Sequence, residues 1–225
     1  MRYFFCLLVL PFFAIAQHEN CPMQSPVNIV SSHSGTGTHQ VIVHYKTSKE
    51  HVANLGHTVE VDYDSGSYIT YDGLNYDFKQ FHFHTPSEHT LDDTHYPLEM
   101  HIVHTSHEAS GQGPYYLVVG VFFEKGEQSH FLETFLSAIP DEEGEVFNSS
   151  KVEIDATEMI PSELHGFYNY RGSLTTPPYT ESVNWIILKE IKSASVDQIE
   201  TFRNIEGNNA RHVQALYNRV VESVD

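Results

Sequence analysis

The stretch Gln80-Phe81-His82-Phe83-His84 decides both the fold class and the chemistry of this chain. Aromatic residues alternate with histidines, which predicts a β-strand because successive side chains of a strand point to opposite faces. Phe81 and Phe83 then face a core, and His82 and His84 share the other face about 6.6 Å apart. Two imidazoles at this spacing can converge on one metal ion, although a lone pair of this kind is more often a surface feature or a hydrogen-bonded buried pair.

A third metal ligand is expected on the strand Leu98-Glu99-Met100-His101-Ile102-Val103-His104, where Glu99 and His101 share a face. Three neutral imidazoles leave the fourth tetrahedral position to water, which is typical of a catalytic zinc site. Zinc lowers the pKa of that water toward neutrality. Gln80 and Glu99 each lie two residues from a histidine on the same face, where they can fix the orientation of the imidazole rings.

The rest of the chain predicts a mainly β domain with a few short peripheral helices. Alternating segments separated by Gly, Asp and Ser clusters indicate strands at residues 41–45, 58–63, 68–71, 76–84, 98–105, 116–123 and 183–188. Helical spacing appears at residues 130–139 and at 195–204, where Ser195 is a candidate N-cap. No repeat or linker indicates a second domain.

Composition narrows the function classes. The 225 residues are 40% hydrophobic and 12% aromatic, which excludes an intrinsically disordered chain. A formal charge of −18 argues against nucleic acid or an anionic membrane surface as a partner, since both attract clustered Lys and Arg. Sixteen histidines are an unusual number, and they point to metal binding, proton transfer or an accidental excess on the surface.

The first sixteen residues predict a secretory signal peptide, which leaves residues 17–225 as one catalytic domain. Met1-Arg2 is followed by an apolar stretch and by the small residues Ala14 and Ala16. The stretch is shorter than the roughly 20 residues that span a bilayer, so we expect no membrane anchor and a secreted or periplasmic protein. Cleavage leaves Cys21 as the single cysteine, either free, buried or joined to a second chain in a homodimer.

Six blocks of the sequence resemble the α-class carbonic anhydrases, in particular exported, bacterial-type members. The resemblance implies a single domain with a large, twisted, mostly antiparallel central β-sheet and short peripheral helices. It also implies reversible hydration of carbon dioxide to bicarbonate and a proton, by attack of zinc-bound hydroxide with a histidine proton shuttle. Sulfonamide or anion inhibitors are expected to bind. The blocks are residues 24–29, 80–84, 87–90, 99–104, 173–178 with 183–185, and 209–219.

The resemblance also implies a role for each matched site residue. Zinc is bound by His82, His84 and His101, Thr175 and Glu88 orient the hydroxide, and His57 is the proton shuttle. The backbone carbonyl of Asn209 is expected to orient His84, and His89 and His104 are expected to be structural. The remaining positions are the substrate pocket (Val103, Val118, Leu174, Thr176, Val183 and Trp185) and the solvent network (Asn54 and Tyr170).

The sequence departs from the family pattern at three places, so two other functions are considered. The N-terminal segment before Gln24 is short, Tyr179 replaces a cysteine that pairs with the Cys21 position in many exported members, and Glu60 and Leu55 replace polar residues near the shuttle. One alternative is a carbonic-anhydrase-like binding module that has lost its metal, but such relatives typically lose a zinc histidine. The other is a periplasmic zinc-storage protein, which would need more clustered exposed histidines.

Overall fold

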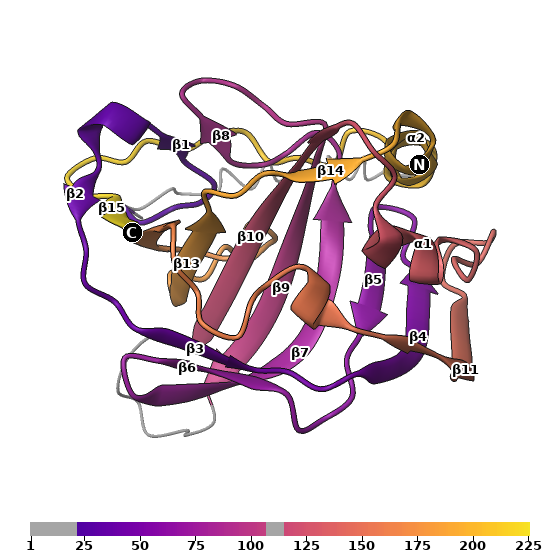
Figure 1. Ribbon diagram of the computed structural model, residues 1–225. Helices are drawn as coiled ribbons and strands as arrows, with labels where there is room; N and C mark the ends of the chain where they lie inside the picture. The colour runs from indigo at the N-terminus through magenta and orange to yellow at the C-terminus, as the bar shows by residue number, and fades with distance from the viewer. Residues whose placement is uncertain (1–21, 107–114) are drawn as a thin grey trace, which may run out of the picture.

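Strands dominate the part of the chain that this computed structural model describes, residues 22–106 and 115–225 (Figure 1). Its two α-helices are α1 (His130–Leu136) and α2 (Val196–Glu206). The signal peptide expected at residues 1–16 lies outside the described residues. The strands are β1 (Asn28–Ile29), β2 (Gly35–Thr36), β3 (Val41–His44), β4 (Ser48–Asn54), β5 (Val59–Asp62), β6 (Tyr68–Tyr71), β7 (Leu74–His84), β8 (Thr90–Leu91), β9 (Leu98–Ser106), β10 (Tyr116–Lys125), β11 (Val146–Ile154), β12 (Phe167–Gly172), β13 (Val183–Leu188), β14 (Lys192–Ala194) and β15 (Glu222–Val224).

One large sheet organises the molecule. Its 13 strands follow the order β11-β4-β5-β7-β9-β10-β13-β12-β15-β2, with β3, β6 and β14 attached beside this path. The long central strands β7, β9 and β10 pair antiparallel, whereas β10 pairs parallel with β13. The predicted mainly β fold with a mostly antiparallel central sheet is therefore confirmed.

Strands with clear alternation were predictable and strands without it were not. The predicted segment 183–188 coincides with β13, and 76–84 lies within β7. Strands β4, β11 and β12 were not predictable from the sequence. Strand β11 is a sheet edge on which almost every residue is exposed, so no buried face imposes a hydrophobic period on it. Strand β12 is buried on both faces, which removes the alternation for the opposite reason.

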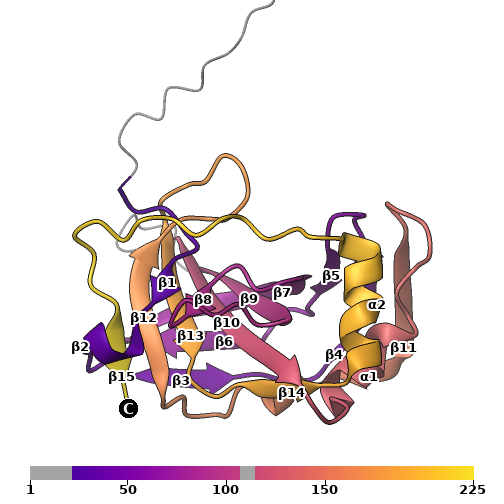
Figure 2. The ribbon, with the colours of Figure 1, turned by 90° about the horizontal axis from the view of Figure 1, so that it is seen from above.

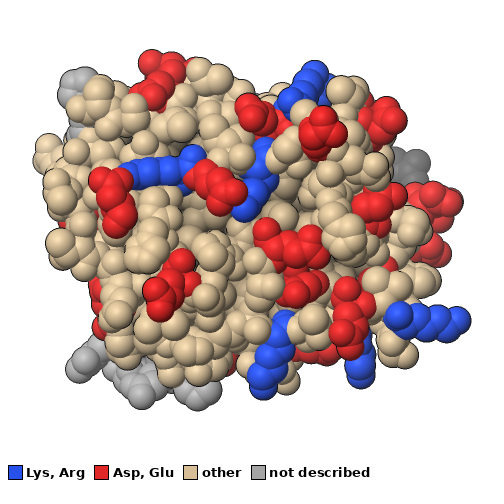
Figure 3. Space-filling model, in the orientation of Figure 1, with Lys and Arg blue, Asp and Glu red and all other residues tan. Residues whose placement is uncertain are grey.

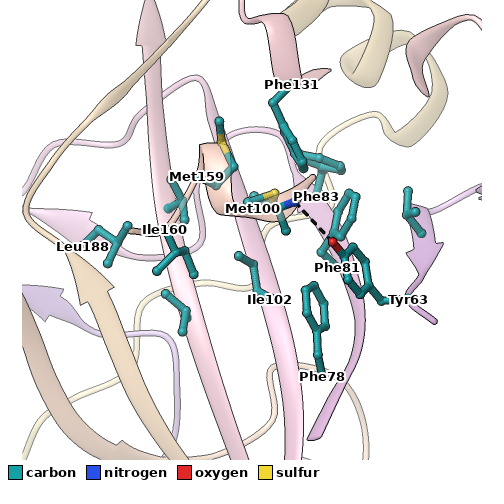
Figure 4. Close-up of a cluster of buried hydrophobic side chains, with 14 of the residues drawn as sticks. Tyr63, Phe78, Phe81, Phe83, Met100, Ile102, Phe131, Met159, Ile160 and Leu188 are labelled. Atoms are coloured by element: carbon teal, nitrogen blue, oxygen red, sulfur yellow. Dashed lines mark hydrogen bonds between the residues drawn. The ribbon is translucent and has the colours of Figure 1, made fainter. Parts of the chain in front are cut away.

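The face of β7 that carries Phe81 and Phe83 packs against the two helices. Both phenylalanines are fully buried, and Figure 4 shows them beside Met100, Ile102 and Phe131 in the core. The ring centroids of Phe83 and Phe202 of α2 lie 4.3 Å apart, and those of Phe81 and Phe131 of α1 lie 5.5 Å apart. Burying each phenylalanine stabilises the fold by about 1.5–3 kcal/mol, which holds the opposite, histidine-bearing face in place.

After α2, the chain returns across the other face of the sheet before it joins the edge as β15 (Figure 2). The amide of Gln214 donates to the carbonyl of Pro26 and the amide of Asn209 donates to the carbonyl of Thr85, which fix this segment over the ends of β1 and β7. No helix in the described ranges is long and apolar enough to cross a lipid bilayer.

Candidate metal centre and active site

Three histidines from two paired strands meet in the middle of the sheet. The pairing register of β7 and β9 places His82 directly opposite His101, and His84 lies two residues further along β7. The ring centroids are 5.1 Å apart for His82 and His84, 5.3 Å for His82 and His101, and 4.6 Å for His84 and His101. One nitrogen from each ring lies within 4.8 Å of the others, an arrangement that suits a single metal ion.

Buried polar atoms without a hydrogen-bond partner test whether a metal ion fits between the histidines. Buried polar atoms nearly always have a partner, because leaving one unpaired costs about 1–3 kcal/mol. Among the described residues, the buried side-chain atoms without a partner are Nδ1 and Nε2 of His84 and Oε2 of Glu88. Two of these atoms border one space, since His84 Nε2 and Glu88 Oε2 are 3.6 Å apart. A cation between the three imidazoles would give His84 its missing partner.

The protonation states of two of the three histidines also suit metal ligands, whereas for His101 the effect of burial is outweighed by Glu99, which raises the pKa of this ring. Burial, followed by repulsion from the neighbouring histidines, lowers the pKa of His82 and His84 well below the usual value. Both rings are therefore neutral near pH 7, which is the form of histidine that coordinates metals.

Side chains behind two of the rings set which nitrogen faces the space. His82 Nδ1 donates to Gln80 Oε1 at 2.9 Å, and His101 Nε2 donates to Glu99 Oε1 at 2.9 Å. This leaves Nε2 of His82 and Nδ1 of His101 free to point toward the centre. The structure thus places Gln80 and Glu99 where the alternation of each strand predicts them.

Glu99 has a wider role than the sequence indicated. It is fully buried, accepts a hydrogen bond from His89 Nδ1 at 2.8 Å, and also accepts the backbone amides of Glu88 and His89. Burial alone would raise the pKa of Glu99, but the charges of His89 and His101 hold it well below the usual range. One ionised carboxylate therefore positions both a ligand histidine and the loop that carries Glu88.

Asn209 differs from the expectation. No hydrogen bond joins its backbone carbonyl to His84, whose Nδ1 has no hydrogen-bond partner in the described residues. Instead, the Asn209 side chain accepts from the amide of Thr85 at 3.0 Å and donates to the carbonyl of Phe83 at 3.1 Å. Asn209 thus holds the backbone on both sides of His84.

Glu88 and Thr175 border the same space. Glu88 Oε1 accepts the backbone amide of Arg211 at 2.9 Å, while Oε2 faces the histidines. Burial raises the pKa of Glu88, and the charge of His101, the Arg211 amide and the Thr175 hydroxyl oppose that rise. A threonine hydroxyl next to a carboxylate donates its proton there, so its oxygen lone pairs remain available to the space beside the histidines.

A scan against family models matches residues 15–225 to the eukaryotic-type carbonic anhydrases. The chain belongs to this family. A carbonic anhydrase from Nostoc sp. is 34% identical over 213 residues, which cover 94% of this chain and 78% of that protein. A carbonic anhydrase from Neisseria gonorrhoeae is 38% identical over 200 residues, with 88% of this chain and 76% of that protein covered.

Solved structures give the same result. The α-carbonic anhydrase from Thermovibrio ammonificans, solved with the inhibitor sulfanilamide, is 38% identical and matches with a TM-score of 0.82. The match covers 90% of this chain and 87% of that chain. The chain is therefore a carbonic anhydrase, an enzyme that hydrates carbon dioxide, and the family resemblance in its sequence is confirmed.

The active-site cavity of this carbonic anhydrase has a volume of about 570 Å³ and one apolar side. Thr175 and Thr176 line it near the histidines. Tyr116 is a wall residue that the sequence analysis missed, because nothing in its own strand distinguishes a residue facing a cavity from one facing a core. The apolar wall consists of Val103, Tyr116, Val118, Leu174 and Trp185.

The opposite side of the cavity is polar and includes His57. Its ring is held by a contact of 2.9 Å between Nδ1 and the carbonyl of Leu55. Glu60 lies on the same side, and burial raises its pKa, as does Asp62, while the charge of His57 lowers it. His57 therefore lines the same cavity as the histidine cluster and is also open to solvent.

Three predicted site residues lie away from the cavity. Val183 is buried in the apolar cluster with Trp185 and is not part of the cavity wall. Asn54 stabilises the turn before His57, because its side chain donates to the carbonyl of Pro140 and accepts from the amide of Gly56. Tyr170 is buried beneath the site and pairs with His89 Nε2 at 2.7 Å, so it supports Glu99 through His89.

His104 behaves as a structural residue. It lies on the face opposite the histidine cluster. Its Nδ1 contacts the carbonyl of Leu117, and its Nε2 lies 2.6 Å from the hydroxyl of Tyr45. Burial lowers its pKa to about 4, so the ring is neutral and the histidine has no part in the metal centre.

Proposed function

We propose that this carbonic anhydrase interconverts carbon dioxide and bicarbonate with a zinc ion held by His82, His84 and His101. The observation that carries the proposal is the buried, unpaired Nε2 of His84 inside a cluster of three imidazoles. Zinc bound by three neutral imidazoles lowers the pKa of a water molecule in its open position toward neutrality. The residues around the cluster supply orientation, substrate binding and proton removal.

Thr175 and Glu88 are positioning residues. The Glu88 carboxylate is fixed by the Arg211 amide and accepts a hydrogen bond from the Thr175 hydroxyl. With its proton engaged there, the hydroxyl oxygen can only accept, so Thr175 would orient a water or hydroxide beside the histidine cluster. Fixing the nucleophile in this way removes orientational freedom before the reaction.

The apolar wall suits the substrate. Carbon dioxide is small and uncharged, so it displaces loosely held water from the surface formed by Val118, Leu174 and Trp185 without losing hydrogen bonds. Bicarbonate is charged and binds such a surface less well, which favours its release once it forms.

His57 removes the proton. Imidazoles take and release protons near neutral pH, and this ring lines the same cavity as the cluster while remaining open to solvent. It can therefore accept a proton from water in the cavity and pass it to buffer.

Carbon dioxide hydration measured by stopped flow, together with the zinc content of the same sample, tests the zinc centre. His82→Ala should lose both zinc and hydration, whereas His44→Ala, a surface control, should retain both. Full zinc occupancy without sulfonamide-sensitive hydration would contradict the proposal and support a binding module. Binding of many zinc ions per chain would support zinc storage instead.

The shuttle role has its own test. His57→Ala should keep its zinc and lose roughly a hundredfold of turnover in dilute buffer, at the lower end of the usual size of general acid–base effects. Added imidazole should restore the rate, because it replaces the lost proton acceptor. Unchanged turnover in dilute buffer would show that another group carries the proton.

The proposal extends to inhibitors, export and assembly. The Thermovibrio relative was solved with sulfanilamide, and we propose that this chain binds sulfonamides at the same histidine cluster. We also propose export by a signal peptide at residues 1–16, which predicts a mature protein that begins at Gln17 in mass spectrometry. A disulfide-linked homodimer through Cys21, which lies outside the described residues, is tested by electrophoresis with and without reductant.

A further inference from the structure

A second cavity, of about 460 Å³, lies on the opposite face of the sheet from the histidine cluster. The alternation of β12 and β13 places Asn169, Arg171 and Asn184 on this face, while Trp185 and its site-side neighbours point the other way. The loop before β3, the turn between β6 and β7, and the segment that leads into β15 close the remaining sides. No part of the carbonic anhydrase reaction uses this cavity.

His39 bridges both carboxylates that line the cavity and offsets one of their two negative charges. Its Nδ1 lies 2.6 Å from Asp72 and its Nε2 lies 2.7 Å from Glu222. Both ring nitrogens must carry a proton to donate to two carboxylates, so the ring is an imidazolium. Partial burial lowers the pKa of His39, but its hydrogen bonds to Asp72 and Glu222 outweigh that effect and raise it.

Arginines then make the cavity net positive. Arg219 is occupied, since it donates to the backbone carbonyls of Leu216, Arg171 and Ala215. In contrast, the guanidinium of Arg171 has no hydrogen bond or ion pair with any described residue. This is unusual on an acidic protein, where most of the Lys and Arg side chains visible in Figure 3 lie beside Asp or Glu.

The Arg171 guanidinium lines the same cavity as two aromatic side chains, Tyr71 and Tyr76. Burial raises the pKa of both tyrosines, and the positive charge of Arg171 opposes this rise. Leu74 and Val220 add apolar surface at the rim, where their side chains are exposed. The cavity is thus lined by a planar cation that has no partner among the described residues and by apolar side chains.

We propose that this second cavity binds a small organic anion, a carboxylate with an aromatic or apolar body, through Arg171. A guanidinium presents two parallel N–H groups that match the two oxygens of a carboxylate. His39, Arg171 and Arg219 carry three positive charges against the two negative charges of Asp72 and Glu222, so the cavity does not repel such a ligand, and its tyrosine rings can pack against the ligand's body. An inorganic anion would leave the apolar walls uncovered, and a cation would meet the positive charge of Arg171.

Benzoate is the probe, and the Nε–H signals of the arginine side chains in proton–nitrogen NMR spectra report on its binding to the zinc-loaded protein. We expect a saturable shift of the Arg171 signal at millimolar concentrations and a roughly tenfold or greater loss of affinity in Arg171→Gln, the usual size of a lost charged hydrogen bond. Neutral benzamide should give no saturable shift over the same range.

Two further variants separate this cavity from other sites. Arg203→Gln removes a surface arginine of α2 that pairs with Glu200, and it should leave benzoate affinity unchanged. His82→Ala removes a proposed zinc ligand and should also leave it unchanged, so failure of the zinc proposal would not affect this result. Equal affinity in Arg171→Gln, loss of binding in His82→Ala, or no saturable shift at tens of millimolar benzoate would each overturn the proposal.

Discussion

Glu206, the last residue of α2, is a buried carboxylate whose importance the sequence did not indicate. Its Oε1 accepts the backbone amide of Val59 at 2.9 Å, and its side chain also lies within reach of Thr58 and Asn209. Burial raises its pKa to about 8, although these three contacts oppose the rise. Because Asn209 also binds the backbone beside His84, Glu206 belongs to the support of the metal centre.

This raised pKa predicts a pH dependence of stability. Between the ordinary glutamate pKa near 4.5 and about 8, the folded chain retains a proton at Glu206 that the unfolded chain has released. The free energy of unfolding should therefore fall as the pH rises through this window. The glutamine of Glu206→Gln cannot ionise, so the free energy of unfolding of this variant should not fall in the same way. Across the window, the variant should become more stable relative to the parent by an amount on the order of a few kcal/mol.

Urea unfolding of the parent and of Glu206→Gln at several pH values in that window measures the difference. Glu200→Gln, at an exposed site on the same helix, is the control and should follow the parent. Parallel pH profiles of the parent and Glu206→Gln would show that Glu206 is ionised in the folded protein.

At the scale of elements, Gln198 joins the starts of both helices. Within α2 it forms a capping box with Ser195, in which each side chain bonds the backbone of the other. Its amide also accepts from the backbone N–H of Ser129, the N-cap of α1, and donates to the Ser129 carbonyl. The two helices that support the phenylalanine face of β7 are thus coupled through one buried side chain.

Gln198→Ala should therefore destabilise the protein more than the loss of one cap. We expect a decrease of about 2–3 kcal/mol in the free energy of unfolding, because the Ser129 backbone groups lose their partners in a buried place. Ser195→Ala should cost about 1 kcal/mol. Gln128→Ala, at an exposed site, should change stability by less than about 0.5 kcal/mol. Denaturant unfolding ranks the three variants by their free energy of unfolding. Equal losses of stability in Ser195→Ala and Gln198→Ala would contradict the coupling of the two helices.

At the scale of the whole molecule, the metal centre connects the two halves of the sheet. His82 and His84 lie on β7, His101 lies on β9, and Glu88 lies in the connection between these strands. The segment after α2 closes the site through Arg211 and Asn209. A ligand bound only by the folded arrangement stabilises that arrangement as a whole.

Removal of zinc should lower the thermal stability of the entire domain. Zinc at a thousandfold excess over its dissociation constant contributes about 4 kcal/mol, which corresponds to roughly 10 °C in the unfolding midpoint of a protein this large. Calorimetry before and after treatment with a chelator measures the change. His82→Ala should already unfold at the lower temperature and should show no further shift with chelator, whereas a chelator shift that persists in this variant would place the stabilising metal elsewhere.

The sequence by itself predicted the cluster of three histidines and the mainly β fold class, because the period of two along a strand is a local property. Alternation placed Phe81 and Phe83 on the core face and His82 and His84 on the other, and the same rule placed Glu99 beside His101. Only the tertiary structure decided which other residues reach the active-site cavity. Val183, Asn54 and Tyr170 lie outside it, whereas Tyr116 lies in its wall.

The second cavity shows the same limit more clearly. His39, Asp72, Arg171 and Glu222 come from four separate segments, and nothing in any one of them predicts that they meet. Such contacts depend on strand register, on the path of the chain after α2 and on how the faces of the sheet are covered. These are properties of packing between distant segments, and local periodicity contains no information about them.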